Sequence, residues 1–400
     1  MVVLNDLSEA KGGASAIALL CAMCARQSGV PVTLLAGDQG QNAELETAGV
    51  SIVSLGRKRL RSANPIEAFA RGIYNRDARR MVSAWIKNND TPRTIYHLHG
   101  WAQILSPSVF AALEPVRDRL ILSAHDFFLT CPNGAYFNYR TSEPCVLVPL
   151  SWACRGTHCD RRSYAEKLWR VTRQALQRHF SPASDSPPVL VVHQAMIPSL
   201  VRGGIREEVI SVLLNPVIPW TQTRIQAERN SQLLFVGRLE ETKGPDLALA
   251  AARRAGAQLK LIGDGSMRSL LEQRYPEMLF MGSLPHTQIG EHAAKARLLL
   301  MPSRYPEPFG LAAVEALWSG LPAIVPPSAS LAQDVVATGC GLRADPKDCA
   351  AYSNVIRAAL ADDEHIKSMS CAGFEKNAAL ALSSSEWCER LISVYASRLQ

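Results

Sequence analysis

The chain has 400 residues, of which 47% are hydrophobic and 20% charged, a balance that excludes an intrinsically disordered chain and predicts a globular one. This length is too great for one ordinary core and suits two domains of about 150 to 200 residues each. No apolar run reaches the roughly 18 residues of a membrane-spanning helix, and the first residues lack the basic and apolar regions of a secretion signal. We therefore expect a cytoplasmic protein whose ten cysteines are mostly thiols.

The net charge of +7 lies entirely in the first half of the chain: residues 1–215 hold 24 Lys and Arg against 17 Asp and Glu, and the remainder holds 19 of each. The excess is densest in residues 57–61, which read Arg-Lys-Arg-Leu-Arg. More arginines follow at Arg71, Arg76, Arg79 and Arg80. Two interpretations stay open, an anionic partner (a membrane surface, a lipid diphosphate or a nucleic acid) and a basic face that is merely solvated. Because no nucleic-acid-binding motif accompanies the charge, we expect no nucleic-acid partner. A membrane partner would place the protein peripherally on the inner face of the plasma membrane.

Short apolar runs alternate with longer amphipathic stretches along the first half, which is typical of strand–helix–strand units on a parallel sheet. The predicted strands are residues 2–4, 31–35, 52–55, 94–97, 119–123 and 189–192. The clearest predicted helices are residues 14–28, 65–88 and 163–179.

The second half repeats the same alternation. Its predicted strands are residues 233–236, 259–262, 279–281, 298–301 and 322–325, with helices such as 245–255 and 311–318 between them. Pro216 and Pro219 coincide with the change in charge balance, so we expect one domain at 1–216 and another at 217–382. A last helix at 383–400, with Trp387, Leu391 and Tyr395 at helical spacing, would cross back to the first domain. The predicted fold class is therefore α/β, two Rossmann-like domains whose parallel sheets face each other across a ligand-binding cleft.

Two glycine-containing turns follow predicted strands and begin predicted helices. In Lys-Gly-Gly-Ala-Ser, residues 11–15, Gly12 and Gly13 allow backbone N–H groups to approach a phosphate, although a tight turn alone would also need them. In residues 235–244, which read FVGRLEETKG, Arg238 and Lys243 flank the start of the next helix. Two such cations can bind a diphosphate, and the alternative is a surface ion pair of Arg238 with one of the glutamates that follow it.

Two carboxylates eight residues apart carry the third motif, residues 302–316, which read PSRYPEPFGLAAVEA. Glu307 lies in the predicted loop and Glu315 two turns into the predicted helix. Carboxylates bind sugar and ribose well because they accept two hydrogen bonds from neighbouring hydroxyls. The motif therefore predicts a site for a sugar or a nucleoside.

Together, Glu307 and Glu315 within PSRYPEPFGLAAVEALWSGLPAIV, the string FVGRLEETKGPDLALAA and the string KGGAS resemble the retaining glycosyltransferases of family 4. These are group 1 glycosyltransferases of bacterial polysaccharide synthesis, and they have the GT-B fold. The resemblance implies that Arg238 and Lys243 hold the donor diphosphate, that Glu315 binds the ribose, and that Glu307 contacts the donor sugar near the reacting carbon. It further assigns to the nucleotide-sugar site Gly12, Gly13, Gly263, Phe309, Gly310 and Leu311. It implies no catalytic metal, in keeping with the absence of an Asp-x-Asp string.

Histidines end two neighbouring predicted strands, in His97-Leu98-His99-Gly100-Trp101 and Ser123-Ala124-His125-Asp126. By the resemblance, His125 contacts the donor sugar, and His99 and Gly100 lie on the acceptor side. A structural role for a single histidine is the alternative.

Four cysteines lie within 29 residues, at Cys131, Cys145, Cys154 and Cys159. In a reducing compartment they could hold a structural zinc ion that clamps a long loop. Their intervals match no tight C-x2-C pair, so unpaired buried thiols remain the alternative. Of the others, Cys21 and Cys24 are expected in the core of the first helix.

The sequence departs from the family where many members carry Gly-Gly-x-x-Glu after the last strand, since residues 326–334 read PPSASLAQD. Asp334 is the candidate for the place of that acid, and the loop over the donor is expected to differ in shape from that of the family.

The resulting expectation is a retaining, metal-independent hexosyltransferase whose catalytic groups are Glu307, His125, Arg238 and Lys243. Its donor would be a UDP- or GDP-sugar, and its acceptor a saccharide or a lipid-diphosphate-linked saccharide of surface or exopolysaccharide synthesis. The alternatives are a nucleotide-sugar epimerase or phosphorylase on the same fold, or a relative that binds saccharide or nucleotide without catalysis.

Overall fold

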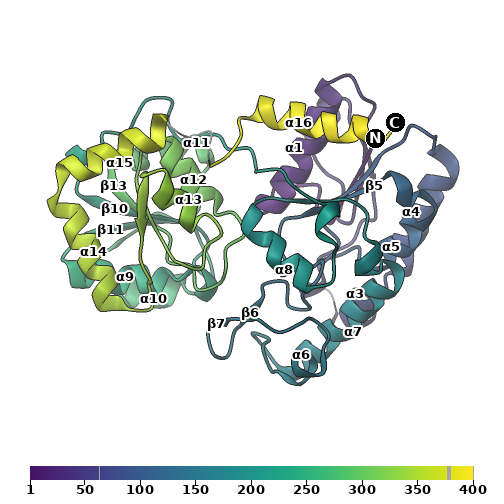
Figure 1. The fold of residues 1–400 in the computed structure, drawn as a ribbon, viewed down its shortest axis with the longest axis horizontal. Helices are drawn as coiled ribbons and strands as arrows, with labels where there is room; N and C mark the ends of the chain where they lie inside the picture. Colours follow the sequence, from purple (N-terminus) through teal and green to yellow (C-terminus); the bar gives the residue numbers. More distant parts are fainter. Residues whose placement is uncertain (63, 376–379, 400) are drawn as a thin grey trace. The chain divides into compact units, whose positions relative to one another are not determined.

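The computed structural model describes residues 1–62, 64–375 and 380–399; the side chains of residues 61, 65 and 66, the first of them in the basic run, lie outside the described part. The chain forms two compact units (Figure 1). The N-terminal unit comprises Met1–Thr141, Cys145–Asn215 and Ser385–Gln400, and the C-terminal unit comprises Ser142–Pro144 and Pro216–Ser384.

The N-terminal unit contains a seven-stranded parallel sheet in the order β3-β2-β1-β4-β5-β8-β9. Its strands are β1 (Val2–Asn5), β2 (Thr33–Ala36), β3 (Ser51–Ser54), β4 (Tyr96–Leu98), β5 (Leu120–Ala124), β8 (Val189–Val191) and β9 (Ile210–Val212). Two further strands have two residues each: β6 (Phe137–Asn138) lies in the N-terminal unit, and β7 (Glu143–Pro144) lies in the short segment that belongs to the C-terminal unit. Strands β1, β4, β5 and β8 are buried on both faces, as expected for a parallel sheet covered by helices.

The helices of the N-terminal unit are α1 (Gly13–Gln27), α2 (Ala43–Thr47), α3 (Pro65–Ile73), α4 (Arg76–Asn89), α5 (Ser108–Leu113), α6 (Trp152–Gly156), α7 (Tyr164–Phe180), α8 (Ile197–Arg202) and α16 (Ser384–Ser397). The prediction of a single helix at 65–88 was wrong, because the stretch forms two helices, α3 and α4, with Asn75 at the start of the second. The side chain of Asn75 accepts a hydrogen bond from the backbone N of Ala78 and so caps a new helix.

The C-terminal unit contains a six-stranded parallel sheet in the order β12-β11-β10-β13-β14-β15. Its strands are β10 (Gln232–Val236), β11 (Leu259–Ile262), β12 (Leu279–Phe280), β13 (Ala296–Leu300), β14 (Ala323–Val325) and β15 (Gly341–Arg343). Its helices are α9 (Pro245–Ala255), α10 (Arg268–Arg274), α11 (His286–Ala293), α12 (Leu311–Trp318), α13 (Ala332–Ala337), α14 (Cys349–Ala361) and α15 (Asp363–Glu375).

Each predicted strand overlaps a strand of one of the two parallel sheets; the sequence missed the two-residue strands β6 and β7 and, in the parallel sheets, β9 and β15. Both lie at the edge of their sheets, and most of their residues are exposed or half-buried, so neither shows as an apolar run.

In each sheet the strand order reverses at one point, so that the chain adds later strands on the other side of the first strand. This reversal point lies between β1 and β4 in the N-terminal unit and between β10 and β13 in the C-terminal unit. In open parallel sheets, ligands bind outside the carboxyl ends of the strands at such a point. The loops that follow these four strands contain Gly12, His99, Lys243 and Glu307. The topology therefore brings most of the predicted site residues to the two positions where a ligand is expected.

Helix α16 belongs to the N-terminal unit and lies beside α1 (Figure 1). It buries Trp387, Leu391 and Tyr395, which confirms the helical spacing predicted for them. A disulfide joins Cys24 of α1 to Cys388 of α16, so this pair is an exception to the expected thiols, and eight cysteines are free.

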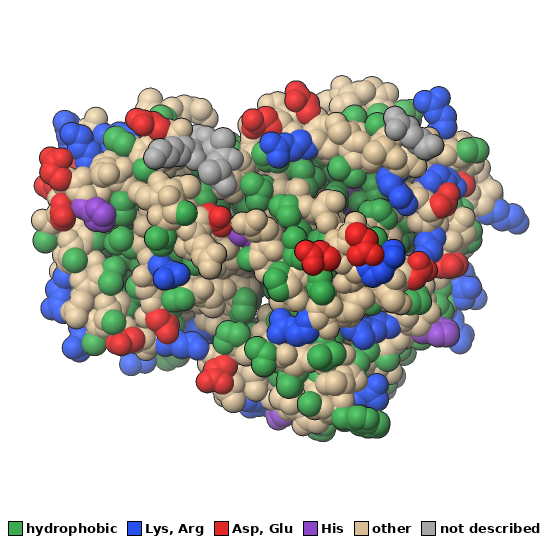
Figure 2. Space-filling view, in the orientation of Figure 1, with side chains coloured by type: hydrophobic (Ala, Val, Ile, Leu, Met, Phe, Trp, Pro, Cys, Tyr) green, Lys and Arg blue, Asp and Glu red, His purple; other side chains and the backbone are tan. Residues whose placement is uncertain are grey.

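On the face drawn in Figure 2, Lys and Arg side chains of both units lie among Asp and Glu side chains rather than in one continuous field. Within the described residues, no helix combines the length and the apolar character needed to cross a membrane.

Candidate functional site

The carboxyl end of β10 leads into a short loop and then into α9. Gly244 occupies the position before α9 in a left-handed conformation, with φ 67°. A Cβ atom at Gly244 would lie 2.1 Å from the carbonyl oxygen of Pro302, so only glycine lets this loop approach the loop that follows β13. The backbone N of Arg304 also donates a 2.9 Å hydrogen bond to the carbonyl of Thr242. The two loops are thus held against each other at the reversal point of the sheet.

Lys243 and Glu307 form an ion pair across these two loops. The carboxylate of Glu307 is buried and also accepts a 2.6 Å hydrogen bond from the hydroxyl of Ser303. The ammonium of Lys243 lies 3.4 Å from the hydroxyl of Tyr305 and 5.5 Å from the centre of its ring. These contacts hold the cation at the point where α9 begins, next to the carboxylate of Glu307.

Glu307 is ionised in this setting. Burial alone would raise its pKa, but the charge of Lys243 and the hydrogen bonds from Lys243 and Ser303 outweigh burial and hold the pKa below its ordinary value. The backbone carbonyl of Glu307 accepts a hydrogen bond of 3.0 Å from the N of Ser330, which ties this loop to the segment that replaces Gly-Gly-x-x-Glu. Asp334, the last residue of that segment, lies in the first turn of α13.

Arg238 follows Gly237 at the end of β10. Its guanidinium pairs with Glu240 at 2.9 Å, which is the surface ion pair weighed as an alternative, and the side chain stays 64% exposed. An exposed pair of this kind contributes little to stability, at most about 1 kcal/mol. Arg238 can therefore exchange Glu240 for a more highly charged group such as a phosphate.

Glu315 lies on α12 and has two partners outside that helix. The indole N–H of Trp220 donates to it at 3.1 Å, and the ring of His286 lies 3.6 Å from its other oxygen. This contact raises the pKa of His286 above its ordinary value. Trp220 is itself fixed because its backbone N donates to the hydroxyl of Ser319, one turn beyond Glu315. The carboxylate is thus oriented from two sides and keeps part of its surface open.

Glycines shape the rest of this edge of the sheet. A Cβ atom at Gly263, after β11, would lie 1.9 Å from the carbonyl oxygen of Gly237, so these two strand ends pack backbone against backbone. Gly310 has a left-handed conformation, with φ 80°, and directly precedes α12, whose first residue is Leu311. Phe309, the residue before Gly310, is buried. The N–H groups at the start of α12 point to the same edge, where they favour a negative charge.

The N-terminal unit places glycines at the start of α1. Gly12 precedes the helix with φ 140°, and Gly13 is its first residue. Lys11 pairs with Glu9 in the same loop. Asp6 follows β1 directly. Its buried carboxylate accepts hydrogen bonds of 2.7 to 2.8 Å from the backbone N atoms of three residues after β4.

The structure brings together the histidines that follow β4 and β5. Nδ1 of His99 and Nε2 of His125 are 3.0 Å apart, and the two rings stack at 5.2 Å. The remaining ring nitrogens, Nε2 of His99 and Nδ1 of His125, are buried without a hydrogen-bond partner. Gly100 follows His99, and a Cβ atom there would lie 2.5 Å from Oδ1 of Asn5.

Burial keeps these histidines neutral. It lowers the pKa of His125 to about 4 and, aided by the neighbouring histidines, holds the pKa of His99 well below its ordinary value. Asp126 beside them has its pKa raised to about 6, chiefly by burial. A neutral imidazole can accept a proton or a hydrogen bond at physiological pH, which a permanently charged one cannot.

His97, which the sequence analysis named in the same motif without giving it a role, is hydrogen-bonded within a buried cluster next to this pair. Its Nδ1 lies 2.7 Å from the hydroxyl of Tyr395, and its Nε2 lies 2.8 Å from that of Ser123. Among the described residues, Cys21, His97 and His99 form the group with metal-ligand atoms within 4.8 Å of one another. Since both ring nitrogens of His97 already have partners, the contacts describe a hydrogen-bonded core that joins α1, β4 and α16.

The four cysteines considered for zinc lie around one small cavity in the N-terminal unit. Cys131, Cys154 and Cys159 are buried, and Cys145 is half-buried. The buried side chain of Lys167 enters the same cavity.

Comparison with known proteins decides which family the C-terminal unit belongs to. The family model described as "Glycosyl transferases group 1" matches residues 221–376. Residues 221–376 form a group 1 glycosyltransferase domain.

Relatives of this glycosyltransferase domain are found among curated proteins. A glycogen synthase of Mycobacterium tuberculosis is 34% identical over 143 residues, which cover 33% of this chain and 34% of the synthase. The chain thus spans about a third of the length of the first curated relatives that it matches.

Solved structures resemble the whole chain. Sucrose-phosphate synthase from Thermosynechococcus elongatus has a TM-score of 0.73 at 16% identity and covers 99% of this chain and 98% of its own. The Anabaena protein HepE, solved in complex with UDP, has a TM-score of 0.68 at 14% identity and covers 99% of both chains. At such identities the likeness concerns the fold, which confirms the predicted pair of Rossmann-like domains of the GT-B class.

Within the C-terminal unit, the sequence identified the charged residues but missed their partners. Four side chains that the sequence analysis did not single out contact these charged groups. Trp220 and His286 contact Glu315, Ser303 contacts Glu307, and Tyr305 contacts Lys243. Ser303 and Tyr305 lie inside the quoted motif and could have been noticed. Trp220 and His286 are 95 and 29 residues from Glu315, and only the fold brings them to it.

Proposed function

We propose that the protein is a retaining, metal-independent glycosyltransferase of family 4 that transfers a hexosyl group from a nucleoside diphosphate sugar. The observation that carries the proposal is the pairing of Lys243 with the buried Glu307 at the reversal point of the C-terminal sheet. This arrangement places a cation that could hold a diphosphate directly beside a carboxylate that could bind a sugar hydroxyl.

The donor is proposed to lie along the carboxyl ends of β10 to β13. Its diphosphate would be held by Lys243 and Arg238, assisted by the N-terminus of α12. Glu315, oriented by Trp220 and His286, would accept hydrogen bonds from the ribose. The complex of HepE with UDP supports a uridine nucleotide, and a guanosine nucleotide is the other candidate.

In the proposed reaction the acceptor hydroxyl attacks the anomeric carbon on the face that the nucleotide leaves, so the configuration is retained. The departing phosphate takes the proton of the acceptor hydroxyl. Lys243 and Arg238 stabilise the charge that develops on that phosphate, and they act most strongly in the transition state, where this charge is greatest. Glu307 orients the donor sugar. His125, which we also assign to catalysis, contacts the same sugar.

The acceptor is proposed to be a saccharide, free or linked to a lipid diphosphate, of surface or exopolysaccharide synthesis. A cavity of about 350 Å³ in the N-terminal unit supports an anionic acceptor, since Arg57, Lys58 and Arg71 contribute to its lining. Acidic groups line or border it as well, because Arg71 pairs with Glu67 and Arg57 pairs with Asp77. A lipid acceptor would place the protein at the cytoplasmic face of a membrane.

Sedimentation with liposomes tests the lipid part of the proposal. Vesicles that contain anionic lipid should carry the protein down at low salt, and added salt should release it. Binding that ignores both lipid charge and salt would remove the support for a membrane-bound acceptor.

Incubation with UDP- and GDP-sugars, with and without saccharide acceptors, tests the activity itself. The proposal predicts that one class of nucleotide raises the melting temperature and that acceptor accelerates nucleotide release. An epimerase would instead convert the donor without acceptor, and a non-catalytic binding protein would be stabilised without releasing nucleotide. Either result would replace the proposed function.

A further inference from the structure

The chain between β5 and α7 has little regular structure. Residues 125–163 contain only the two-residue strands β6 and β7 and the five-residue helix α6 among their described elements. A connection of this length inside a compact unit is uncommon and needs contacts of its own to hold a single conformation. Four cysteines and one lysine provide the polar centre of this segment.

The four thiols line one cavity of about 10 Å³, which is room for a single ion or water molecule. Cys131 and Cys145 come from the two sides of β6 and β7, and Cys154 and Cys159 lie in and after α6. Their positions draw the beginning, the middle and the end of the segment to the same point.

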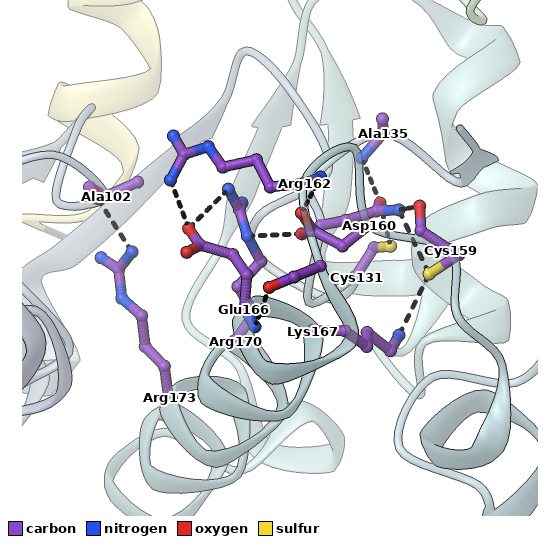
Figure 3. Close-up of polar contacts among 12 residues, drawn as sticks. Ala102, Cys131, Ala135, Cys159, Asp160, Arg162, Glu166, Lys167, Arg170 and Arg173 are labelled. Carbon is purple, nitrogen blue, oxygen red and sulfur yellow. Dashed lines mark hydrogen bonds and ion pairs between the residues drawn. The ribbon is translucent and has the colours of Figure 1, made fainter. Parts of the chain in front are cut away.

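Lys167, on α7, reaches into this cavity and is 1% exposed. Its ammonium donates a hydrogen bond of 3.2 Å to the sulfur of Cys159 (Figure 3). It donates another of 3.4 Å to the sulfur of Cys154. Within the described residues it has no ion pair with a carboxylate, since the nearby Asp160 pairs with Arg170 at 2.8 Å. The partners of this buried cation are therefore sulfur atoms.

A buried ammonium that faces only neutral thiols would lose its hydration without gaining a counter-charge, which is costly. Thiolates bound to a metal ion would supply that counter-charge. The sulfur of Cys159 also accepts a hydrogen bond of 3.4 Å from the amide of Asn133. Hydrogen bonds from N–H donors stabilise a thiolate, so these contacts suit a metal ligand.

We propose that Cys131, Cys145, Cys154 and Cys159 bind one zinc ion, with Lys167 donating hydrogen bonds to two of the thiolates and offsetting their charge. Binding forms four Zn–S bonds and releases four thiol protons, with no change of oxidation state. The resulting centre carries a net charge of two minus, half of which the ammonium of Lys167 balances.

The thiols must close in to bind the ion. Tetrahedral zinc at about 2.3 Å from each sulfur brings the sulfurs to roughly 3.8 Å from one another. Within the described residues, the group of three ligand atoms that lie within 4.8 Å of one another is Cys21, His97 and His99, so no three of the four sulfurs are this close together. Rotation of the cysteine side chains, all on loops or the short α6, makes the approach feasible, and it would tighten the whole segment.

Metal analysis of the full chain, expressed with zinc and purified under reducing conditions, tests the site. One zinc per chain is expected, falling to near zero in Cys154→Ser and Cys159→Ser. Cys349→Ser and Cys371→Ser alter half-buried thiols elsewhere and should keep the zinc. Cys21→Ser, in the other cluster of metal-ligand atoms, should keep it as well.

Replacement of zinc by cobalt gives a readout on the unaltered protein, so that a variant that fails to fold does not decide the outcome. Four thiolates predict intense sulfur-to-cobalt charge-transfer absorption and the visible bands of a tetrahedral ion. Lys167→Met, which keeps length but not charge, should weaken zinc binding by about 10- to 100-fold in competition with a chromophoric chelator. A metal-free wild-type protein, a cobalt spectrum without thiolate bands, or zinc lost from Cys21→Ser but retained by Cys154→Ser would overturn the proposal.

Discussion

The role proposed for Lys243 depends on the charge of its one ammonium group. Its ammonium pairs with the buried carboxylate of Glu307, which Ser303 also binds. An anionic ligand that enters this edge would share or replace the carboxylate as the partner of Lys243. The same side chain can therefore hold Glu307 in its ionised form before binding and meet a phosphate afterwards.

Replacement of Lys243 by Ala should lower turnover at saturating donor by about 10²- to 10³-fold, because the lost cation meets a charge that grows in the transition state. Steady-state release of nucleotide from the donor sugar measures this. Lys295→Ala removes an exposed lysine of the same unit and serves as the control. Normal turnover of Lys243→Ala would contradict the role given to this residue.

His125 should make the stability of the protein sensitive to acid. Since burial lowers its pKa to about 4, it is neutral when folded and takes up a proton on unfolding between its ordinary pKa near 6.5 and that value. In this window the free energy of unfolding falls with falling pH, by at most about 1.4 kcal/mol per pH unit. The raised pKa of Asp126 acts in the opposite direction, stabilising the folded state at low pH.

Comparison with His125→Asn isolates this contribution, since Asp126 is present in both proteins. Denaturant titrations between neutral pH and about pH 4.5 should show that the wild-type protein loses more stability than the variant. A difference between the two proteins that stays constant with pH would show that His125 does not titrate as described.

At the scale of elements, the sequence predicted most of the sheets, because buried parallel strands appear as short apolar runs. It could predict that Lys243 and Glu307 follow such runs, and the reversal point of a parallel sheet explains why they meet. It could not predict Trp220 and His286 beside Glu315, because those contacts depend on how α11 and the stretch that contains Trp220 pack against α12. It also could not predict that Asn75 would cap a second helix within one amphipathic stretch.

The two ends of α9 offer a matched test of how loop packing sets the site. Gly244 and Gly256 flank this helix, with φ 67° and 71°, so Ala costs a left-handed conformation at either position. A Cβ atom at Gly244 also meets the carbonyl of Pro302 at 2.1 Å, whereas nothing lies within 4 Å of one at Gly256. We expect Gly256→Ala to lose about 1 to 2 kcal/mol of stability and keep nucleotide binding, and Gly244→Ala to lose more and bind nucleotide poorly. Equal effects of the two substitutions in thermal unfolding and calorimetry would refute the close packing of the two loops.

At the scale of the whole molecule, each unit presents its candidate ligand groups at the reversal point of its own sheet. The N-terminal unit contributes paired neutral histidines and glycines at the start of α1, and the C-terminal unit contributes cations and carboxylates. The last helix is part of the N-terminal unit, where Cys388 bonds to Cys24 and Tyr395 contacts His97. The sequence indicated that helix by its apolar spacing but gave no sign of its cysteine partner, which lies 364 residues away.

A crystal structure of the protein with bound UDP or GDP tests the central claim most directly. We expect a diphosphate in contact with Lys243 and Arg238, and a ribose whose hydroxyl groups donate hydrogen bonds to Glu315. A nucleotide bound elsewhere, with Lys243 still paired only to Glu307 and Glu315 free of the ribose, would contradict it.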